Sequence, residues 1–230
     1  MKPLEIRFRL ATPMLVHSEL PFHFDALMAY AVSRDSEMNG SADPWSDAED
    51  LSEILGREGE GDSWVWQASR MEVLARLPYP KIYESANNLR FTDPSRFYDD
   101  LDKGLWQPRG KVNPETFRID PNSGQQRGYQ MYLTTSNAHE VAFYVIGEEE
   151  AIRFYLSQVT HLGKGSKNGH GRISNMEIRA CPEAADRWRK RWLPKDMPGA
   201  HGVEYAPVMG RLRQPYWDQA RFHPVLEPVR

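Results

Sequence analysis

Residues 161–172, HLGKGSKNGHGR, determine how the second half of this 230-residue chain is interpreted. The stretch holds four glycines, two lysines and one arginine but no carboxylate. Glycine lacks a Cβ and accepts positive φ, so successive amide N–H groups can turn toward one anion beside the basic side chains. A helix-to-strand connection with solubilising lysines fits the same letters, and both interpretations stay open. The predicted anion-binding residues are Gly163, Lys164, Gly165, Ser166, Lys167, Asn168, Gly169, His170, Gly171 and Arg172.

Two nucleotide-binding patterns are absent from the loop. It contains no GxxxxGK[ST], and its closest dinucleotide-type pattern follows a helix instead of opening one. The loop therefore favours a nucleic-acid or anion clamp over a nucleotide hydrolase.

Hydrophobic periodicity on both sides of the loop predicts an α+β fold. Residues 148–162 have helical spacing, and residues 173–180 follow as a strand. Apolar residues alternate over 4–10, and helical spacing returns over 24–32, where Asp25 suits the helix N-terminus. Strands are predicted at 63–74, 129–135 and 141–146, the last two joined at Ser136 and Asn137 as a hairpin or a bent strand. The resulting β-α-β-β-α-β order predicts a ferredoxin-like (RRM-like) core, which by itself assigns no function.

Charge is unevenly distributed, although the net charge is only −3. Ten acids and one base lie between residues 35 and 62, whereas nine bases and three acids lie between 164 and 195. Such polarity allows one face to hold a polyanion and another to repel it. The acidic segment also fits a solvated, partly mobile surface loop.

Two insertions and an extension are predicted around the core. The core domain spans 1–180, with insertions at about 35–62 and 77–127, and an Arg/Trp-rich extension over 181–230 packs on it. Six prolines between 77 and 127 predict loops and short hairpins. This second insertion leans basic, and we expect four of its residues to contribute to the anion site: Arg109, Lys111, Arg118 and Arg127.

Two motifs in this order resemble the RAMP superfamily of CRISPR-associated proteins. LPFHFDALMAYAV (20–32) is similar to the superfamily's first-helix segment, and HLGKGSKNGHGRISNMEI (161–178) to its glycine-rich loop. Length and layout resemble the Cas-five-type subunit, and the DALMAYAV form resembles the type IV (Csf) branch. The long acidic segment and the Arg/Trp tail depart from the simplest pattern.

The resemblance implies a non-catalytic RNA-binding subunit of a class 1 CRISPR ribonucleoprotein complex. Such a subunit binds the 5′ handle of the crRNA and caps the backbone filament, and residues 77–127 form a thumb that grips the handle or a neighbour. The implied partners are crRNA, backbone RAMP subunits, a large subunit and, indirectly, target DNA. No cofactor is implied.

Stacking of unpaired bases is a further expectation for an RNA-binding chain. Trp106, Tyr129, Tyr132 and His170 are the candidates, with core packing as the alternative for the tyrosines. Trp188 and Trp192 lie four apart on a predicted helix. Their surroundings offer a second basic face, formed by Arg187, Arg189 and Arg191, unless the tryptophans pack in the core.

Two other functions remain possible from sequence. A metal-independent crRNA-processing endoribonuclease would use His17 and His23 in general acid–base catalysis, and a protein-only adaptor would use neither histidine. No metal motif or nucleophile elbow is present. The single cysteine, Cys181, and the lack of a signal peptide or membrane anchor predict a cytoplasmic protein without a membrane partner.

Overall fold

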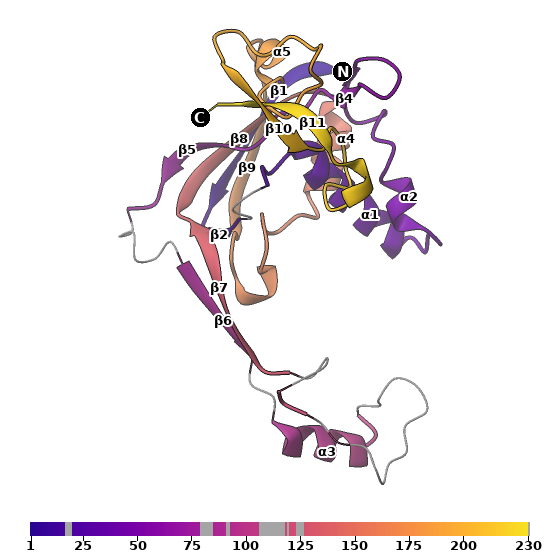
Figure 1. Cartoon of the computed structure of the whole chain (residues 1–230), viewed down its shortest axis with the longest axis vertical. Helices are drawn as coiled ribbons and strands as arrows, with labels where there is room; N and C mark the ends of the chain where they lie inside the picture. The colour runs from indigo at the N-terminus through magenta and orange to yellow at the C-terminus, as the bar shows by residue number, and fades with distance from the viewer. Residues whose placement is uncertain are drawn as a thin grey trace.

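The computed structural model is an α+β fold with antiparallel sheets, as predicted (Figure 1). It describes residues 1–16, 20–78, 85–90, 93–105, 118, 120–122 and 127–229, with the backbone alone at 85–90 and 130–133. The main strands are β1 (Lys2–Leu10), β5 (Glu72–Arg76), β8 (Ala138–Gly147) and β9 (Ile173–Ala180). They form one sheet in the order β5-β8-β1-β9.

Alternating side chains explain the sheet. Leu4, Ile6 and Phe8 lie opposite Val145, Phe143 and Val141 in the antiparallel β1–β8 register, and all six are fully buried. The intervening residues point to the other face, because side chains alternate along a strand. The period-2 pattern over 4–10 therefore places the main core on one face of this sheet.

Two helices cover the core face, α1 (Phe24–Met38) and α4 (Glu149–Leu156). Phe24, Leu27 and Met28 of α1 are buried, as are Ile152 and Leu156 of α4. Both helices begin where the sequence predicts them, but α1 continues past residue 32 to Met38, and α4 ends at Leu156 instead of reaching residue 162. Along the chain, the main elements follow the order β1, α1, β5, β8, α4 and β9.

The segment from 129 to 147 is a bent strand, which settles the choice that the sequence left open. β7 (Tyr129–Ser136) and β8 are separated only by Asn137 and belong to different sheets. β7 pairs with β2 (Met14–Leu15) and β6 (Ser85–Arg90), and β8 pairs with β1 and β5. The β6–β7 hairpin extends away from the central sheet, with α3 (Pro94–Asp102) toward its far end (Figure 1).

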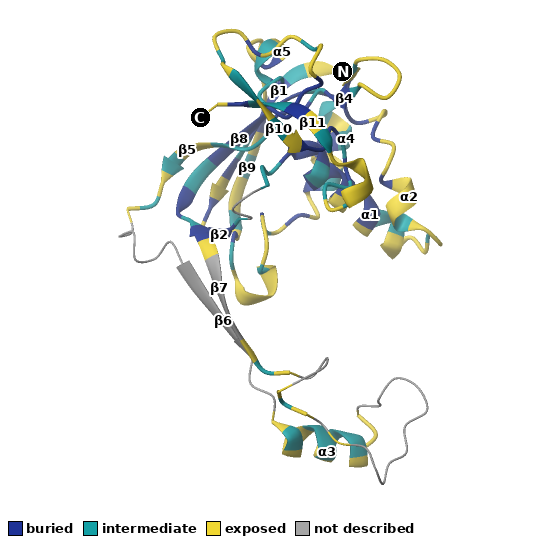
Figure 2. Cartoon of the chain, in the orientation of Figure 1, coloured by how far each residue is buried: buried dark blue, intermediate teal, exposed yellow. Residues whose placement is uncertain are grey.

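The acidic segment is partly packed instead of being only a solvated loop. α2 is the single turn Pro44–Asp47, and the short strands β3 (Arg57–Glu58) and β4 (Val65–Trp66) follow it. Leu51, Ile54 and Leu55 are buried in the main core. Asp47, Glu49, Asp50 and Glu53 lie beside these apolar anchors and are exposed, so the segment presents its charge outward. Figure 2 shows the mixture of buried and exposed residues around α2.

The C-terminal residues form α5 (Ala184–Arg187) and the antiparallel pair β10 (Tyr205–Gly210) and β11 (His223–Pro228), with the 3₁₀ turn Gln219–Arg221 (η4) between these strands. Another 3₁₀ turn, Ser166–Asn168 (η3), lies in the glycine loop. The predicted helix through Trp188 and Trp192 is wrong, since α5 ends at Arg187. Both tryptophans are buried in a second apolar cluster with Val65, Leu212 and Val225. Within the described ranges, no helix is long and apolar enough to cross a membrane.

Candidate nucleic-acid interface

The glycine loop is held against the chain that follows β1. The amide of Lys164 donates to the carbonyl oxygen of Leu15 (3.1 Å), and that of Gly171 donates to Pro13 (2.9 Å). Thr12 also binds the loop, because its hydroxyl donates to the Gly169 carbonyl (2.7 Å) and accepts from the Arg172 amide (2.9 Å). Several of the amides that the sequence offered to an anion are therefore engaged within the protein.

All four glycines of the loop have positive φ, as the sequence predicts. The surroundings that a Cβ would meet differ among these glycines. A Cβ at Gly171 would lie 1.9 Å from the Leu162 carbonyl oxygen, and one at Gly163 would lie 2.4 Å from that of Leu15. A Cβ at Gly169 would meet no atom within 4 Å. Close approach of the protein's own backbone thus requires glycine at 163 and 171, whereas Gly169 faces open space.

A groove of about 2070 Å³ opens beside the loop. Its walls come from α1, the segment that follows α4, the strand β2, the base of β7, and residues 70–76 leading through β5. Five basic side chains and one acidic side chain belong to the described lining. They are Arg34, Arg70, Arg76, Lys164, Lys190 and Glu72. This groove is a concave surface with a positive bias, which suits a phosphate backbone.

The structure divides the predicted loop residues into two groups. Gly163, Lys164, Gly165 and Ser166 line the groove. The other six lie outside its lining: Lys167, Asn168, Gly169, His170, Gly171 and Arg172. Lys167 and Arg172 are exposed nonetheless.

Of the basic residues predicted in the second insertion, the two that the structure describes are not brought to the groove. Arg118 and Arg127 are exposed outside its lining, and Arg109 and Lys111 lie outside the described residues. Among the predicted stacking residues, Tyr129 is exposed and His170 half-buried, whereas Trp106 and the side chain of Tyr132 fall outside the described part. A contribution of the second insertion to the anion site therefore remains a prediction.

Most of the groove's own residues were not among those predicted from the sequence. Tyr30 and Arg34 line it from α1, and Arg70 and Arg76 line it near β5. The helical pattern over 24–32 could have indicated Tyr30, because Tyr30 does not occupy one of its apolar positions and so belongs to its outward face. Arg34 follows one turn later on the same face of α1. Nothing local marked the arginines near β5, because their place depends on strand pairing.

His23, an alternative catalytic residue, is in the core. Its side chain has no exposed surface, and its ring stacks on Tyr216 with 4.8 Å between centroids. The pKa of His23 is held well below its ordinary value, mainly by burial and in addition by the positive charges of Arg191 and Arg70. In this position His23 has no access to an RNA ribose. His17 lies outside the described residues.

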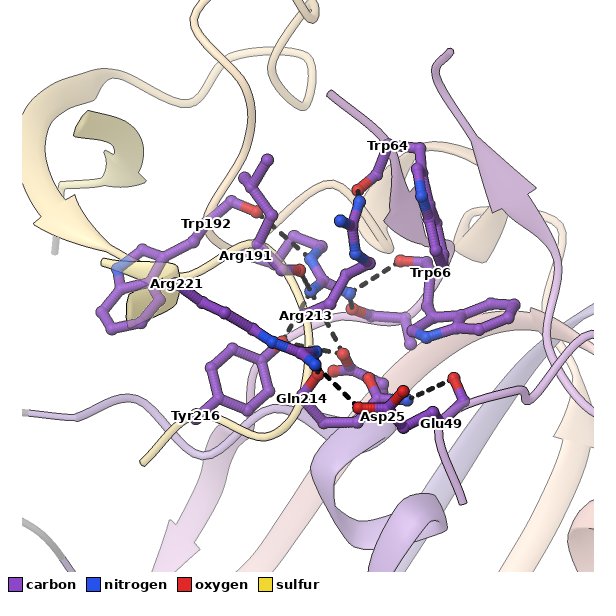
Figure 3. Close-up of polar contacts among 12 residues, drawn as sticks. Asp25, Glu49, Trp64, Trp66, Arg191, Trp192, Arg213, Gln214, Tyr216 and Arg221 are labelled. Carbon is purple, nitrogen blue, oxygen red and sulfur yellow. Dashed lines mark hydrogen bonds and ion pairs between the residues drawn. The ribbon is translucent and has the colours of Figure 1, made fainter. Parts of the chain in front are cut away.

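The predicted basic face of the tail is wrong for a clear electrostatic reason. Arg191 is fully buried and forms an ion pair with the equally buried Asp25 at 3.3 Å (Figure 3). Arg187 and Arg189 pair with Glu72 (2.7 Å) and Glu58 (2.9 Å). These cations are matched by acids of the first half of the chain, so they do not make an open surface for RNA.

The outer face of the central sheet carries paired charges. Arg9 pairs with Glu140 (3.0 Å), and Glu5 accepts hydrogen bonds from Arg7 and Arg179. Burial by itself raises the pKa of the Glu5 carboxyl, but the bonds and charges of the two arginines lower it overall. This sheet face is electrostatically compensated. The groove is compensated only in part, since Lys190 pairs with Glu72 (3.2 Å) and Arg70 with Glu227 (3.3 Å), and its positive bias comes from Arg34, Arg76 and Lys164.

The chain that forms this groove and loop matches a known family over nearly its whole length. The family model described as CRISPR type IV associated protein Csf3 matches residues 2–228. No curated protein matches the chain. Within the described ranges, no group of three or more His, Cys, Asp or Glu side chains is placed to hold a metal ion. The chain belongs to the Csf3 family of type IV CRISPR-associated proteins.

Proposed function

We propose that this protein is a non-catalytic RNA-binding subunit of a type IV CRISPR ribonucleoprotein complex, of the Cas-five type that caps the 5′ handle of the crRNA. The observation that carries the proposal is the groove of about 2070 Å³, in which basic side chains outnumber acidic ones five to one beside the glycine loop. Charge of this kind supplies most of the affinity for a nucleic-acid backbone.

A ferredoxin-like core of the RAMP kind is part of the proposal. It is supported by the order β1, α1, β5, β8, α4, β9 and by the strand order β5-β8-β1-β9, in which β1 and β8 are central. The core domain would span 1–180, with its insertions and the extension 181–230 as the sequence predicts.

The groove is a better RNA site than the outer face of the sheet, which RRM domains use for stacking bases. The aromatic residue at the centre of that face, Tyr144, is 2% exposed and lies beneath Arg187, whose guanidinium carbon is 3.7 Å from the ring centroid. The arginines on this face of the sheet, Arg7 and Arg9, are neutralised by Glu5 and Glu140. We therefore assign RNA to the helix-and-loop side of the sheet.

The remaining partners follow from the same proposal. The projecting β6–β7 hairpin (Figure 1) would act as the thumb and contact either handle nucleotides or a backbone RAMP subunit. A large subunit would complete the complex, and target DNA would be reached only through it.

The test is the salt dependence of RNA binding by the purified full chain. Lys164→Ala/Lys167→Ala removes both loop ammonium groups, so the slope of log K against log salt for repeat RNA should become shallower by about 1.4, or ~0.7 for each phosphate that is no longer neutralised. Lys2→Ala/Lys195→Ala, which removes two exposed lysines outside the groove, is the control. An unchanged slope in the loop variant would remove the loop from the RNA site.

A further inference from the structure

We propose that Tyr30 of α1 is a stacking platform in the groove for one unpaired nucleobase of single-stranded RNA. The inference rests on the proposed function and adds to it a base-binding site. Charge alone binds any polyanion, whereas an aromatic face in the same groove selects a strand whose bases are free to stack.

Tyr30 is exposed in a stretch of α1 that is otherwise buried. The Tyr30 side chain is 49% exposed, whereas Met28, Ala29, Ala31 and Val32 around it are all buried. Across the described ranges, Tyr30 makes no hydrogen bond, ion pair or ring contact, and yet it lines the groove. A large aromatic surface is thus left open to solvent inside a concave site.

Basic side chains line the groove together with Tyr30. Arg34 lies one helical turn after Tyr30, and residues four apart share a helix face. Arg34 forms a long ion pair with Glu37 (3.9 Å), between side chains that are 56% and 67% exposed, so the guanidinium is weakly held. Lys164 belongs to the same lining. Arg34 and Lys164 would hold phosphates while the Tyr30 ring holds a base.

Base stacking and phosphate contact have different experimental signatures. Loss of one stacked base weakens binding by about 5- to 150-fold, and the salt slope does not change. Removal of one phosphate contact makes the slope shallower by about 0.7. Tyr30→Ala should therefore weaken binding at constant slope, whereas Arg34→Ala should change the slope.

The experiment measures binding of the full chain to a single-stranded RNA of ~12 nucleotides, and to a strand of the same length whose bases have been removed. We expect Tyr30→Ala to lose about 5- to 150-fold affinity for the RNA and little for the abasic strand, and Tyr30→Phe to bind both like the wild type. Phe154→Ala is the matched control, because Phe154 is 55% exposed on α4 and does not line the groove.

The outcomes separate the two proposals. If the wild type binds RNA and Tyr30→Ala binds it equally tightly, the stacking site is overturned and the proposed function stays intact. An equal loss of affinity for both strands also overturns it, because a base is then not involved. Absence of any RNA binding by the wild type contradicts the proposed function and, with it, this inference. Thermal unfolding of each variant shows whether the fold is retained.

Discussion

His23 shows how a residue with a plausible chemical role can be a packing residue. The sequence places it between Phe22 and Phe24 at a helix start and makes it one of two candidates for acid–base catalysis. The structure buries the ring between Trp192, at 5.3 Å between centroids, and Tyr216. Neither ring nitrogen has a hydrogen-bond partner among the described residues. A buried imidazole without partners is held in its neutral form, because protonation would place an uncompensated charge in the core.

The neutral form of His23 makes stability depend on pH. Its pKa is lower in the folded state than in the unfolded chain, so the unfolded chain binds more protons as the pH falls below about 6.5. The free energy of unfolding should then decrease by up to ~1.4 kcal/mol per pH unit between pH 6.5 and 5. His23→Phe keeps an aromatic ring and removes the titrating group, so its stability should change less over this range.

Urea unfolding at about pH 7.5 and 5.5 measures this difference. The range is kept above the acidic end because burial also raises the pKa of Asp25 in the same cluster. His201→Gln, which replaces an exposed histidine, is the control. Equal loss of stability in wild type and His23→Phe would show that His23 is not the group responsible.

At the scale of elements, the glycine loop shows what a motif specifies and what it leaves out. The sequence predicted its place between a helix and a strand and the positive φ of its glycines, both of which the structure has. It did not predict what approaches the missing Cβ atoms. At Gly171 that neighbour is the backbone of Leu162, and at Gly163 it is the backbone of Leu15, in the opposite half of the chain. Leu162 approaches Gly171 from within the loop itself, whereas the approach of Leu15 to Gly163 depends on how a distant part of the folded chain meets the loop, which no local pattern encodes.

Substitutions at two of these glycines separate the two causes. Gly169→Ala should cost about 1–2 kcal/mol, the ordinary penalty for a side chain at positive φ, because open space surrounds the position. Gly171→Ala carries the same penalty and in addition forces a Cβ against the Leu162 carbonyl, so a further ~1–3 kcal/mol is expected. Chemical denaturation measures both. Equal costs would mean that the loop moves freely away from Leu162.

At the scale of the whole molecule, the sequence predicted the main elements and their order more successfully than the charge distribution. Periodicity depends on neighbours within one element, and it located β1, α1, β8, α4 and β9. The basic tail looked like an open surface because its acidic partners are distant in sequence; Arg191 and Asp25 are 166 residues apart. The groove was missed for the same reason, since its cations come from several segments that only folding brings together.

Arg191 joins these distant segments, and its removal should destabilise the whole fold. Its guanidinium donates to the carbonyl oxygens of Trp66 (2.7 Å) and Leu212 (2.6 Å) and forms the ion pair with Asp25 (Figure 3). Arg191→Met would leave the buried Asp25 carboxylate without its cation and several buried carbonyls without donors, which costs about 3–5 kcal/mol for a broken buried pair. We expect a correspondingly lower urea midpoint with a single cooperative transition.

A second variant identifies how much of that cost belongs to the charge of Asp25. Asp25→Asn in the Arg191→Met background removes the uncompensated carboxylate while Tyr216, which donates to the Asp25 carboxylate at 2.8 Å, keeps an acceptor at that position. The double variant should therefore be more stable than Arg191→Met alone by ~1–3 kcal/mol. No recovery would assign the loss to the unpaired carbonyls of residues 66, 68 and 212, and the ion pair would then contribute little to holding the tail on the core.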